Sequence, residues 1–541
     1  MNANASRQDD KMISKRNRRH RILIAVIASA ALTSAIVHDG CRRAAAAGTT
    51  TTDMRLADPT WRDAAVAVAK RARQLPPRRR ARNIILFIGD GMGVSTVTAM
   101  RIYDGQQKGG SGEENFLPFE RFPFSALVKT YNANAQVPDS AGTASAMMTG
   151  VKVNIGVLNV SASHPSGQCA GSRKAWLATI AEELEDAGFA TGIVSTARLT
   201  HATPAAVYAH SPSRAWEADV DLTPEAREKG CADIARQLIE FPHGDGIDVA
   251  MGGGRANFLP RGQESGRRGD GRDLVAEWQQ RHPGGRVVHT GHELAAVEPA
   301  ETGHLLGLFT PSHMAFDADR RAGGLDQPSL AEMTQAAIRL LQARNAKGAK
   351  GYFLMVEGGR IDHAHHMGNA FRALSDGRAF TRAVAQARTM TDENETLILA
   401  TADHSHVFVI AGYPPRGNPI LGLVHRIAPD GRPSPELRPG RDGKPYTTLG
   451  YWNGPGAHPE EPRPALDDQT VQAPDYRQQA AVPLDAETHG GEDVPLYASG
   501  PGAVLARGVI EQNEIYHMVR RALGLSPAGD RQGDDRATRE R

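Results

Sequence analysis

Short apolar runs rich in β-branched residues alternate with amphipathic stretches along most of this chain, and this alternation restricts the possible folds strongly. Five runs are predicted to be buried strands, at residues 83–88, 190–195, 247–251, 352–356 and 395–400. The amphipathic stretches predict helices at residues 174–187, 329–344 and 371–390. Strands that alternate with helices form a largely parallel sheet with helices on both faces. The sequence therefore predicts an α/β fold, a three-layer sandwich around a large, mostly parallel central sheet.

The alternation breaks between residues 413 and 487, where Pro, Gly and Asp are frequent. Residues 446–452 keep strand character, so this segment is predicted to be an insertion and not a linker. We expect one α/β domain over residues 81–525, preceded by an N-terminal extension at residues 48–80. The polar tail at residues 526–541 is predicted to be disordered.

The N-terminus has the order of segments that is typical of an export signal. Six basic residues between positions 11 and 21 precede an apolar run at residues 22–37, and an alanine-rich stretch ends at Ala47. The apolar run is shorter than the roughly 20 residues that span a bilayer, which argues against a permanent membrane anchor. Residues 1–47 are therefore predicted to be a cleaved signal, and the protein to be periplasmic or secreted. Cys41 stands in a poor context for lipidation.

Composition excludes several classes of protein. The chain has 541 residues, a formal net charge of +2 and 40% hydrophobic residues, which excludes a disordered, collagen-like or polytopic membrane protein. Near-neutral charge also argues against specific nucleic-acid binding. Three cysteines are too few for a disulfide scaffold. After export, Cys169 and Cys231 could form a disulfide, and two buried free thiols remain the alternative.

Potential metal ligands follow several of the predicted strands. Groups beyond the carboxyl ends of strands in an open α/β sheet converge on one crevice. Histidine and carboxylate together suit zinc, whereas carboxylate and hydroxyl oxygens suit magnesium. Any one of these residues alone would more often cap a turn or a helix, so their recurrence after successive strands carries the argument. They are Asp90, His201, Thr203, Glu357, Asp362, His366, Asp403, His404 and His489.

Ser140 is the candidate nucleophile. It lies in Pro-Asp-Ser-Ala-Gly-Thr-Ala, where a run of small residues follows a helix-start signal. An ordinary helix N-cap at Asp139 or Ser140 is the simpler interpretation of this segment alone. No Gly-x-Ser-x-Gly elbow surrounds Ser140, so a metal ion is the expected means of activating its hydroxyl.

Five motifs together resemble the alkaline phosphatase family, and the animal-type enzymes more than the enterobacterial form. The resemblance covers about residues 83–523 in the family's order. The motifs are Phe-Ile-Gly-Asp-Gly-Met-Gly at 87–93, the Ser140 segment at 138–144, Val-Glu-Gly-Gly-Arg-Ile-Asp-His-Ala-His-His at 356–366, Thr-Ala-Asp-His-Ser-His at 401–406 and Glu-Thr-His-Gly-Gly-Glu-Asp at 487–493.

The resemblance implies two zinc ions and one magnesium ion in each subunit. One zinc would bind Asp362, His366 and His489. The second would bind Asp90, Asp403 and His404 beside Ser140. Magnesium would bind Asp90, Thr203 and Glu357. His201, His363 and His406 are expected to act around these ligands, and a histidine at position 201 leaves zinc open as an alternative in the third site.

The resemblance also implies the reaction. Ser140 would attack the phosphorus of a small-molecule phosphate monoester, and water would then hydrolyse the phosphoserine. Arg214 matches the arginine that grips phosphate oxygens, for which the guanidinium fork is suited.

The resemblance also implies a disulfide and a homodimer, whereas calcium and a lipid anchor are not expected. The family's cysteine pairing coincides with Cys169 and Cys231, and residues 413–487 resemble the crown of the animal-type enzymes, which implies a homodimer. Calcium is doubtful, because Thr310 stands where the animal-type pattern has glutamate. No hydrophobic tail follows Leu525, which disfavours a lipid-anchored form.

Three other functions compete with a phosphomonoesterase. A sulfatase would need a Cys/Ser-x-Pro-x-Arg segment, which is absent around Ser140. A phosphodiesterase of the same superfamily would usually lack the magnesium ligands. A non-enzymatic zinc or phosphate-binding protein would need neither Ser140 nor Arg214.

Overall fold

The structure is a computed structural model that describes residues 53–73, 80–457 and 463–525. The predicted export signal and the predicted disordered tail lie outside these residues. Within the described part, no helix is both long enough and apolar enough to cross a membrane.

A ten-stranded sheet forms the centre of the domain and confirms the predicted fold class. Nearly all neighbouring strands run parallel, and only β16 runs antiparallel to both of its neighbours. In spatial order the strands are β17 (Gly508–Glu511), β2 (Phe124–Lys129), β16 (Val494–Ser499), β8 (Thr396–Ala402), β1 (Asn83–Gly89), β7 (Tyr352–Gly358), β3 (Ala190–Arg198), β4 (Val249–Gly253), β6 (Leu305–Leu308) and β5 (Arg286–Val288).

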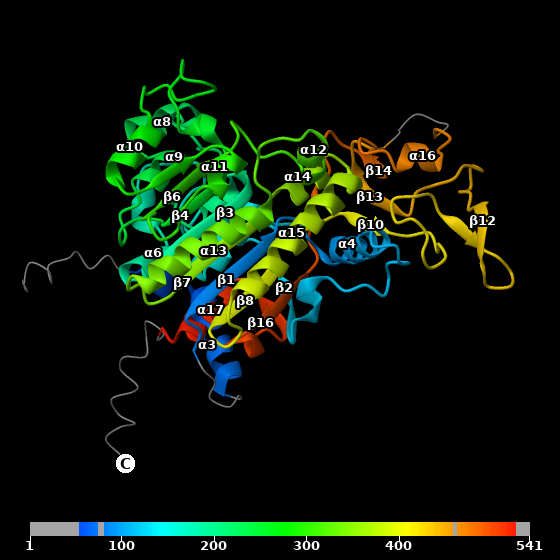
Figure 1. The fold of residues 1–541 in the computed structure, drawn as a ribbon, viewed down its shortest axis with the longest axis horizontal. Coiled ribbons are helices and arrows are strands. Elements are labelled where there is room, and N and C mark those ends of the chain that lie inside the picture. The colour runs from blue at the N-terminus through cyan, green and yellow to red at the C-terminus, as the bar shows by residue number, and fades with distance from the viewer. Residues whose placement is uncertain (1–52, 74–79, 458–462, 526–541) are drawn as a thin grey trace, which may run out of the picture. The chain divides into compact units, whose positions relative to one another are not determined.

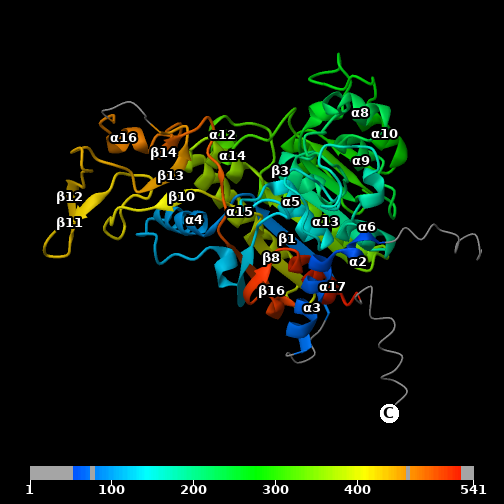
Figure 2. The same ribbon diagram turned by 180° about the vertical axis from the view of Figure 1, so that it is seen from behind.

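Three layers result, because helices cover both faces of this sheet. On one face α13 (Leu330–Ala346) and α15 (Ala370–Met390) lie side by side (Figure 1). On the other face lie α5 (Ser140–Thr149), α6 (Ile180–Asp186) and α17 (Glu514–Leu523), which Figure 2 shows from behind.

The remaining helices are short, apart from α3, α4 and α10. They are α2 (Met54–Ala57), α3 (Pro59–Arg73), α4 (Val94–Gln106), α7 (Ala202–Ala205), α8 (Pro224–Glu228), α9 (Ile234–Ile239), α10 (Leu274–Arg281), α11 (Gly291–Ala295), α12 (Asp317–Ala322), α14 (Arg360–His366) and α16 (Asp468–Val471).

The central strands are buried on both sides. Every residue of β1, β7 and β8 is buried, and Ile84 pairs with Phe353 on one side and with Leu397 on the other. Strands covered on both faces read as continuous apolar runs, which is why the sequence pattern located them.

The helix predicted over residues 174–187 is wrong in its first half. Trp176 forms a β-bridge with Val160, and α6 begins only at Ile180. Thr179 caps this helix through a reciprocal pair of hydrogen bonds with Glu182. A capping box fixes a helix start locally, so the apolar periodicity before Thr179 does not extend the helix.

The insertion builds small sheets of its own beyond β8. Figure 1 shows it in yellow to orange, beside α4 and α14. The strands within it are β11 (His425–Ile427), β12 (Pro433–Leu437), β13 (Leu449–Gly454) and β14 (Ala480–Pro483), and it is flanked by β9 (Ser405–His406), β10 (Phe408–Ile410) and β15 (His489–Gly490). They pair as β10-β13-β14, β11-β12 and β15-β9, so the strand predicted at residues 446–452 corresponds to β13.

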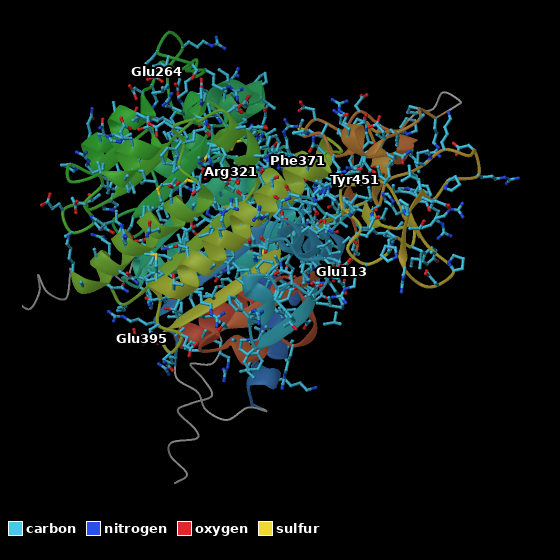
Figure 3. The ribbon with its side chains drawn as sticks, turned by 45° about the vertical axis from the view of Figure 1, so that its right-hand side comes forward. Glu113, Glu264, Arg321, Phe371, Glu395 and Tyr451 are labelled. Carbon is cyan, nitrogen blue, oxygen red and sulfur yellow. A yellow bond between two sulfur atoms is a disulfide. The ribbon has the colours of Figure 1, made fainter. Side chains whose placement is uncertain are left out.

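One side chain joins the insertion to α14. Figure 3 marks Tyr451 on β13 and Phe371 near the start of α15. The Tyr451 hydroxyl lies 2.8 Å from His365 Nδ1, and both residues are buried. The insertion is therefore packed onto the helix that carries Asp362 and His366.

Cys169 and Cys231 form a disulfide, which confirms the predicted pairing. Cys169 packs with Trp216, Leu222 and Ala226 in a small apolar cluster.

Candidate active site

The candidate ligands gather at the carboxyl edge of the sheet, as predicted. Asp90 follows β1, Glu357 lies near the end of β7, and Asp403 follows β8. Gly91 makes the turn after β1 with φ of +68°, and a Cβ there would lie 2.3 Å from the His406 ring. Glycine is thus required at this point both for its backbone conformation and for space.

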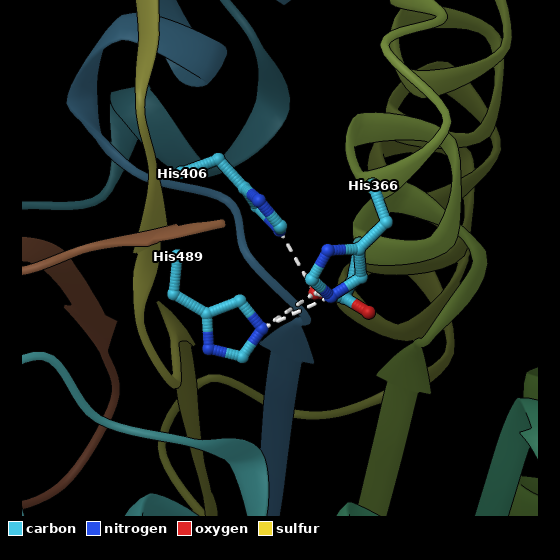
Figure 4. Close-up of side chains that lie close together, drawn as sticks. His366, His406 and His489 are labelled. Atoms are coloured by element: carbon cyan, nitrogen blue, oxygen red, sulfur yellow. Dashed lines mark hydrogen bonds and ion pairs between the residues drawn. The ribbon is translucent and has the colours of Figure 1, made fainter. Parts of the chain in front are cut away.

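One group of ligands comprises Asp362, His366 and His489, and Figure 4 shows how the two histidines point toward each other. His366 and His489 bring their Nε2 atoms to 3.3 and 3.4 Å from Asp362 Oδ1, and 3.1 Å from each other. Asp362 and His366 stand four residues apart on α14, so their side chains lie on the same face of this helix.

Hydrogen bonds fix the tautomers of both histidines. His366 Nδ1 donates to the carbonyl of Glu487 at 2.6 Å, and His489 Nδ1 donates to the carbonyl of Pro138 at 2.8 Å. In the neutral rings the Nε2 atoms would therefore present lone pairs to each other and to a carboxylate. Lone pairs that face one another repel unless a cation lies between them, so this donor set fits a metal ion.

His406 also approaches Asp362 but is bound differently. Its Nε2 lies 2.8 Å from Asp362 Oδ1 and its Nδ1 lies 2.5 Å from Glu487 Oε2. Although burial opposes the charge, the two carboxylates raise the pKa of His406 to about 10. A carboxylate lies against each ring nitrogen, so His406 orients Asp362 and neither nitrogen is free for a metal.

A second group comprises Asp90, Asp403 and His404, all fully buried. His404 Nε2 lies 3.4 Å from Asp90 Oδ1 and 3.4 Å from Asp403 Oδ2. His404 Nδ1 donates to the Ser405 carbonyl at 3.2 Å, so Nε2 again carries a lone pair. The backbone N–H groups of Gly91 and His404 hold Asp403 Oδ1.

A third group consists of oxygens. Asp90 Oδ2, Thr203 Oγ1 and Glu357 Oε1 are buried and form no hydrogen bond of normal geometry with described residues. Buried oxygens without partners are costly. Three of them together fit a hard cation that prefers oxygen ligands.

Burial raises the pKa values of three carboxylates in the second and third groups. Burial and three neighbouring carboxylates raise the pKa of Asp90 well above its usual range. Burial also raises the pKa of Glu357 to about 7 and that of Asp403 to about 6. So much buried negative charge calls for compensating cations.

Ser140 lies at the first position of α5 and is 1% exposed. Its Oγ lies 3.1 Å from His404 Nε2 and 3.5 Å from Asp90 Oδ1, which places it against the second group. Asp139 is the N-cap, because its Oδ1 accepts from the N–H of Gly142 at 3.1 Å.

Arg214 is bound to the same Asp139, the residue that precedes Ser140. One Arg214 Nη donates to Asp139 Oδ2 at 2.9 Å and the other lies 3.1 Å from His201 Nε2. The guanidinium side chain is 28% exposed. It is therefore anchored at the site and accessible to an incoming anion.

His201 and His363 lie together beside the third group, with ring centroids 5.2 Å apart. Arg214 donates to His201 Nε2, so the neutral ring carries its proton on Nδ1. Burial and Arg214 lower the pKa of His201 well below its usual range.

Sequence reasoning missed His313 and gave no role to Glu487. His313 lies in the loop after β6, with its ring centroid 4.0 Å from that of His363. An Arg198 Nη lies 2.5 Å from His313 Nε2, and its positive charge disfavours a cation among these three histidines. Glu487 stands two residues before His489, and that proximity was the available signal.

Near Thr310, the backbone N–H groups of Gly254 and Arg255 both donate to the Thr310 carbonyl. An Arg255 Nη lies 3.4 Å from the Leu308 carbonyl. The expectation that calcium is doubtful stays a prediction.

The family model described as alkaline phosphatase matches residues 81–525. The chain is 45% identical over 487 residues to the tissue-nonspecific alkaline phosphatase of Gallus gallus, covering 86% of this chain and 89% of that protein. It is 43% identical over 477 residues to the Homo sapiens counterpart, covering 85% and 87%.

Among solved structures, the alkaline phosphatase of Thermus thermophilus is 26% identical, with a TM-score of 0.59, covering 84% of this chain and 94% of that one. The enzyme of the Antarctic bacterium TAB5 shares the fold at 21% identity with a TM-score of 0.56, covering 83% of this chain and all of that one.

The parallel sheet and the ligand groups at its carboxyl edge define a protein of the α/β class with candidate metal sites. The chain belongs to the alkaline phosphatase family and is an enzyme that hydrolyses phosphate monoesters.

Proposed function

We propose that this protein hydrolyses small phosphate monoesters through a covalent phosphoserine at Ser140. The observation that carries the proposal is the position of Ser140 Oγ, buried between the His404 group on one side and the segment anchored by Asp139 and Arg214 on the other. A binding protein would have no use for a hydroxyl held in this way.

Three ions are proposed to complete the site. The Asp362, His366 and His489 group would hold one zinc ion. The Asp90, Asp403 and His404 group would hold a second, and the oxygens of Asp90, Thr203 and Glu357 would hold magnesium. When bound, these ions would supply positive charge that lowers the pKa of the Ser140 hydroxyl and stabilises the leaving oxygen.

The chain's own residues account for the remaining steps. Ser140 Oγ attacks phosphorus in line, a new O–P bond forms, the bond to the alcohol oxygen breaks, and the alcohol leaves with a proton that replaces the one Ser140 gives up. Arg214 donates to the phosphoryl oxygens while Asp139 fixes its orientation. Water then attacks the phosphoserine and releases inorganic phosphate, which restores Ser140.

Magnesium is favoured over zinc in the third group. His201 Nε2 accepts from Arg214, which leaves the proton of the neutral ring on Nδ1, and Nδ1 has no hydrogen-bond partner among the described residues. A protonated nitrogen donates a hydrogen bond and does not bind a metal. His201 and His363 are thus proposed to act on the ligands or on phosphate and not on the ion.

Rates on paired substrates test this function. The purified protein with zinc and magnesium is expected to hydrolyse a phosphate monoester far faster than the matching diester. Ser140→Ala should lose most of this turnover, on the order of 10³-fold or more. Wild-type turnover by Ser140→Ala, or a preference for the diester, would contradict the proposal.

Export is also proposed. The N-terminal order of basic, apolar and small residues supports a leader cleaved near Ala47. Mass spectrometry of the protein recovered from outside the cytoplasm should find an N-terminus close to that position. Recovery of the intact chain beginning at Met1 would oppose it.

A further inference from the structure

Glu487 is a buried carboxylate that the proposed reaction does not use. It lies between β14 and β15, two residues before His489, and is 1% exposed. A carboxylate buried so fully is costly unless its oxygens are hydrogen-bonded.

The backbone of Glu487 is bound to His366. Its N–H donates to the His366 carbonyl at 3.0 Å, and its carbonyl accepts from His366 Nδ1 at 2.6 Å. The second contact fixes the His366 tautomer with a lone pair on Nε2.

The side chain of Glu487 reaches a second ligand through His406. Oε1 accepts from the Val407 N–H at 2.8 Å, and Oε2 accepts from His406 Nδ1 at 2.5 Å. His406 Nε2 in turn donates to Asp362 Oδ1 at 2.8 Å.

The insertion holds this loop in place. Asn453, on β13, accepts from the Thr488 N–H at 3.0 Å and donates to the Thr488 Oγ1 at 2.9 Å. Gly454 has φ of +133°, and a Cβ there would approach Glu487 Cβ to 3.0 Å. The insertion therefore packs against Glu487, the residue that contacts His366 and His406.

We infer that Glu487 is a positioning residue for the first metal group, which holds Asp362 through His406 and His366 through its own carbonyl, and that the insertion keeps it in place through Asn453 and Gly454. The inference rests on the proposed function of that group as a zinc site. It assigns the insertion a direct part in the affinity for that zinc.

Zinc affinity tests the inference. Glu487→Gln keeps the size of the side chain but leaves one oxygen where the carboxylate uses two, to accept from His406 Nδ1 and from the Val407 N–H. Competition with a chelator is expected to show a loss of about 10–100-fold in the affinity for one of the two zinc ions, the one proposed for the Asp362, His366 and His489 group. The thermal unfolding of the metal-free variant should remain a single transition. If Glu487 served only the general packing, a loss of zinc affinity would not occur together with intact unfolding behaviour.

Asp485→Asn is the matched control, because Asp485 is exposed in the same loop and carries the same charge. It should bind zinc as the wild type does. Asn453→Ala leaves Glu487 intact and should lose zinc affinity in the same direction by a smaller factor.

The outcomes separate this inference from the proposed function. A wild-type protein that binds no zinc would refute both. If the wild type binds zinc and the zinc affinity of Glu487→Gln is within twofold of the wild-type value, the inference alone fails. If Glu487→Gln does not fold, unchanged zinc affinity in Asn453→Ala overturns the inference.

Discussion

Asp139 joins two parts of the site that are distant in sequence. Its Oδ1 accepts from the backbone N–H groups of Gly142 and Gly156, and its Oδ2 accepts from Arg214. One carboxylate therefore fixes both the start of the helix that carries Ser140 and the direction of the guanidinium. The position of Arg214 depends on this fork more than on its charge alone.

Replacement of Arg214 by lysine should weaken phosphate binding. Lysine keeps the charge but cannot bind Asp139 and two phosphate oxygens in one plane. We expect the inhibition constant for inorganic phosphate to rise about tenfold, which corresponds to about 1.4 kcal/mol. Arg378→Lys, which alters a pair with Asp104, serves as the control. Equal inhibition of the Arg214→Lys variant and the wild type would argue against this role.

The sequence locates some site residues better than others. Asp90 and Asp403 can be predicted because each follows a buried strand, and parallel strands end at a common edge. Glu487 and His313 lie in loops whose position depends on long-range packing. No local pattern shows that Glu487 reaches His406 across 81 residues.

At the scale of elements, the sequence also locates the buried parallel strands better than the partly exposed strands. β1 and β7 are continuous apolar runs, and their predicted bounds are close to those observed. β2 is half exposed in alternation and pairs with β16, which is distant in sequence. Such a strand carries a weaker signal, because its pattern reflects one buried face only.

A buried ion cluster stabilises the start of α9. Arg268 is fully buried and its two Nη atoms donate to Asp233, the N-cap of α9, at 3.0 and 3.1 Å. Arg268→Met would leave Asp233 buried without its partner. We expect a loss of about 3–5 kcal/mol in the free energy of unfolding, measured with denaturant.

The neighbouring Arg267 provides the control for that measurement, because its side chain is 42% exposed and also pairs with an aspartate. Arg267→Met should cost less than about 1 kcal/mol. Similar losses in both variants would show that burial of Arg268 is not the cause.

The end of α6 should make stability depend on pH through His243. Hydrogen bonding to Glu182, and then to Asp186, raises the pKa of His243 to about 9, although burial opposes this. A raised pKa stabilises the fold fully below the unfolded value of about 6.5, and the stabilisation is lost as pH rises through about 9.

His243→Gln should therefore lower the free energy of unfolding at pH 6 and have little effect at pH 10. Denaturant titrations at pH 6, 8 and 10 would measure the difference, with the exposed His292→Gln as the control. A difference from the wild type that is the same at all three pH values would be the contrary result.

At the scale of the whole molecule, the proposed homodimer concerns the insertion. Val409 on β10 and Trp452 on the neighbouring β13 are 47% and 63% exposed. Large apolar side chains exposed on adjacent strands support a contact with a second copy.

Light scattering with size exclusion should give twice the mass of one chain. Trp452→Arg is expected to shift the protein toward the monomer, because it places a charge in the proposed contact. The exposed Val66→Arg on α3 is the control. A wild-type monomer at micromolar concentration would exclude the homodimer.

The central claim is the covalent step at Ser140, and trapping the intermediate tests it most directly. The metal-loaded enzyme would be mixed with a phosphate monoester, quenched in acid within one turnover, and digested for mass spectrometry. The peptide that contains Ser140 should carry one phosphoryl group, and Ser140→Ala should carry none. Turnover without a phosphorylated Ser140, or a phosphoryl group on another residue, would contradict the mechanism.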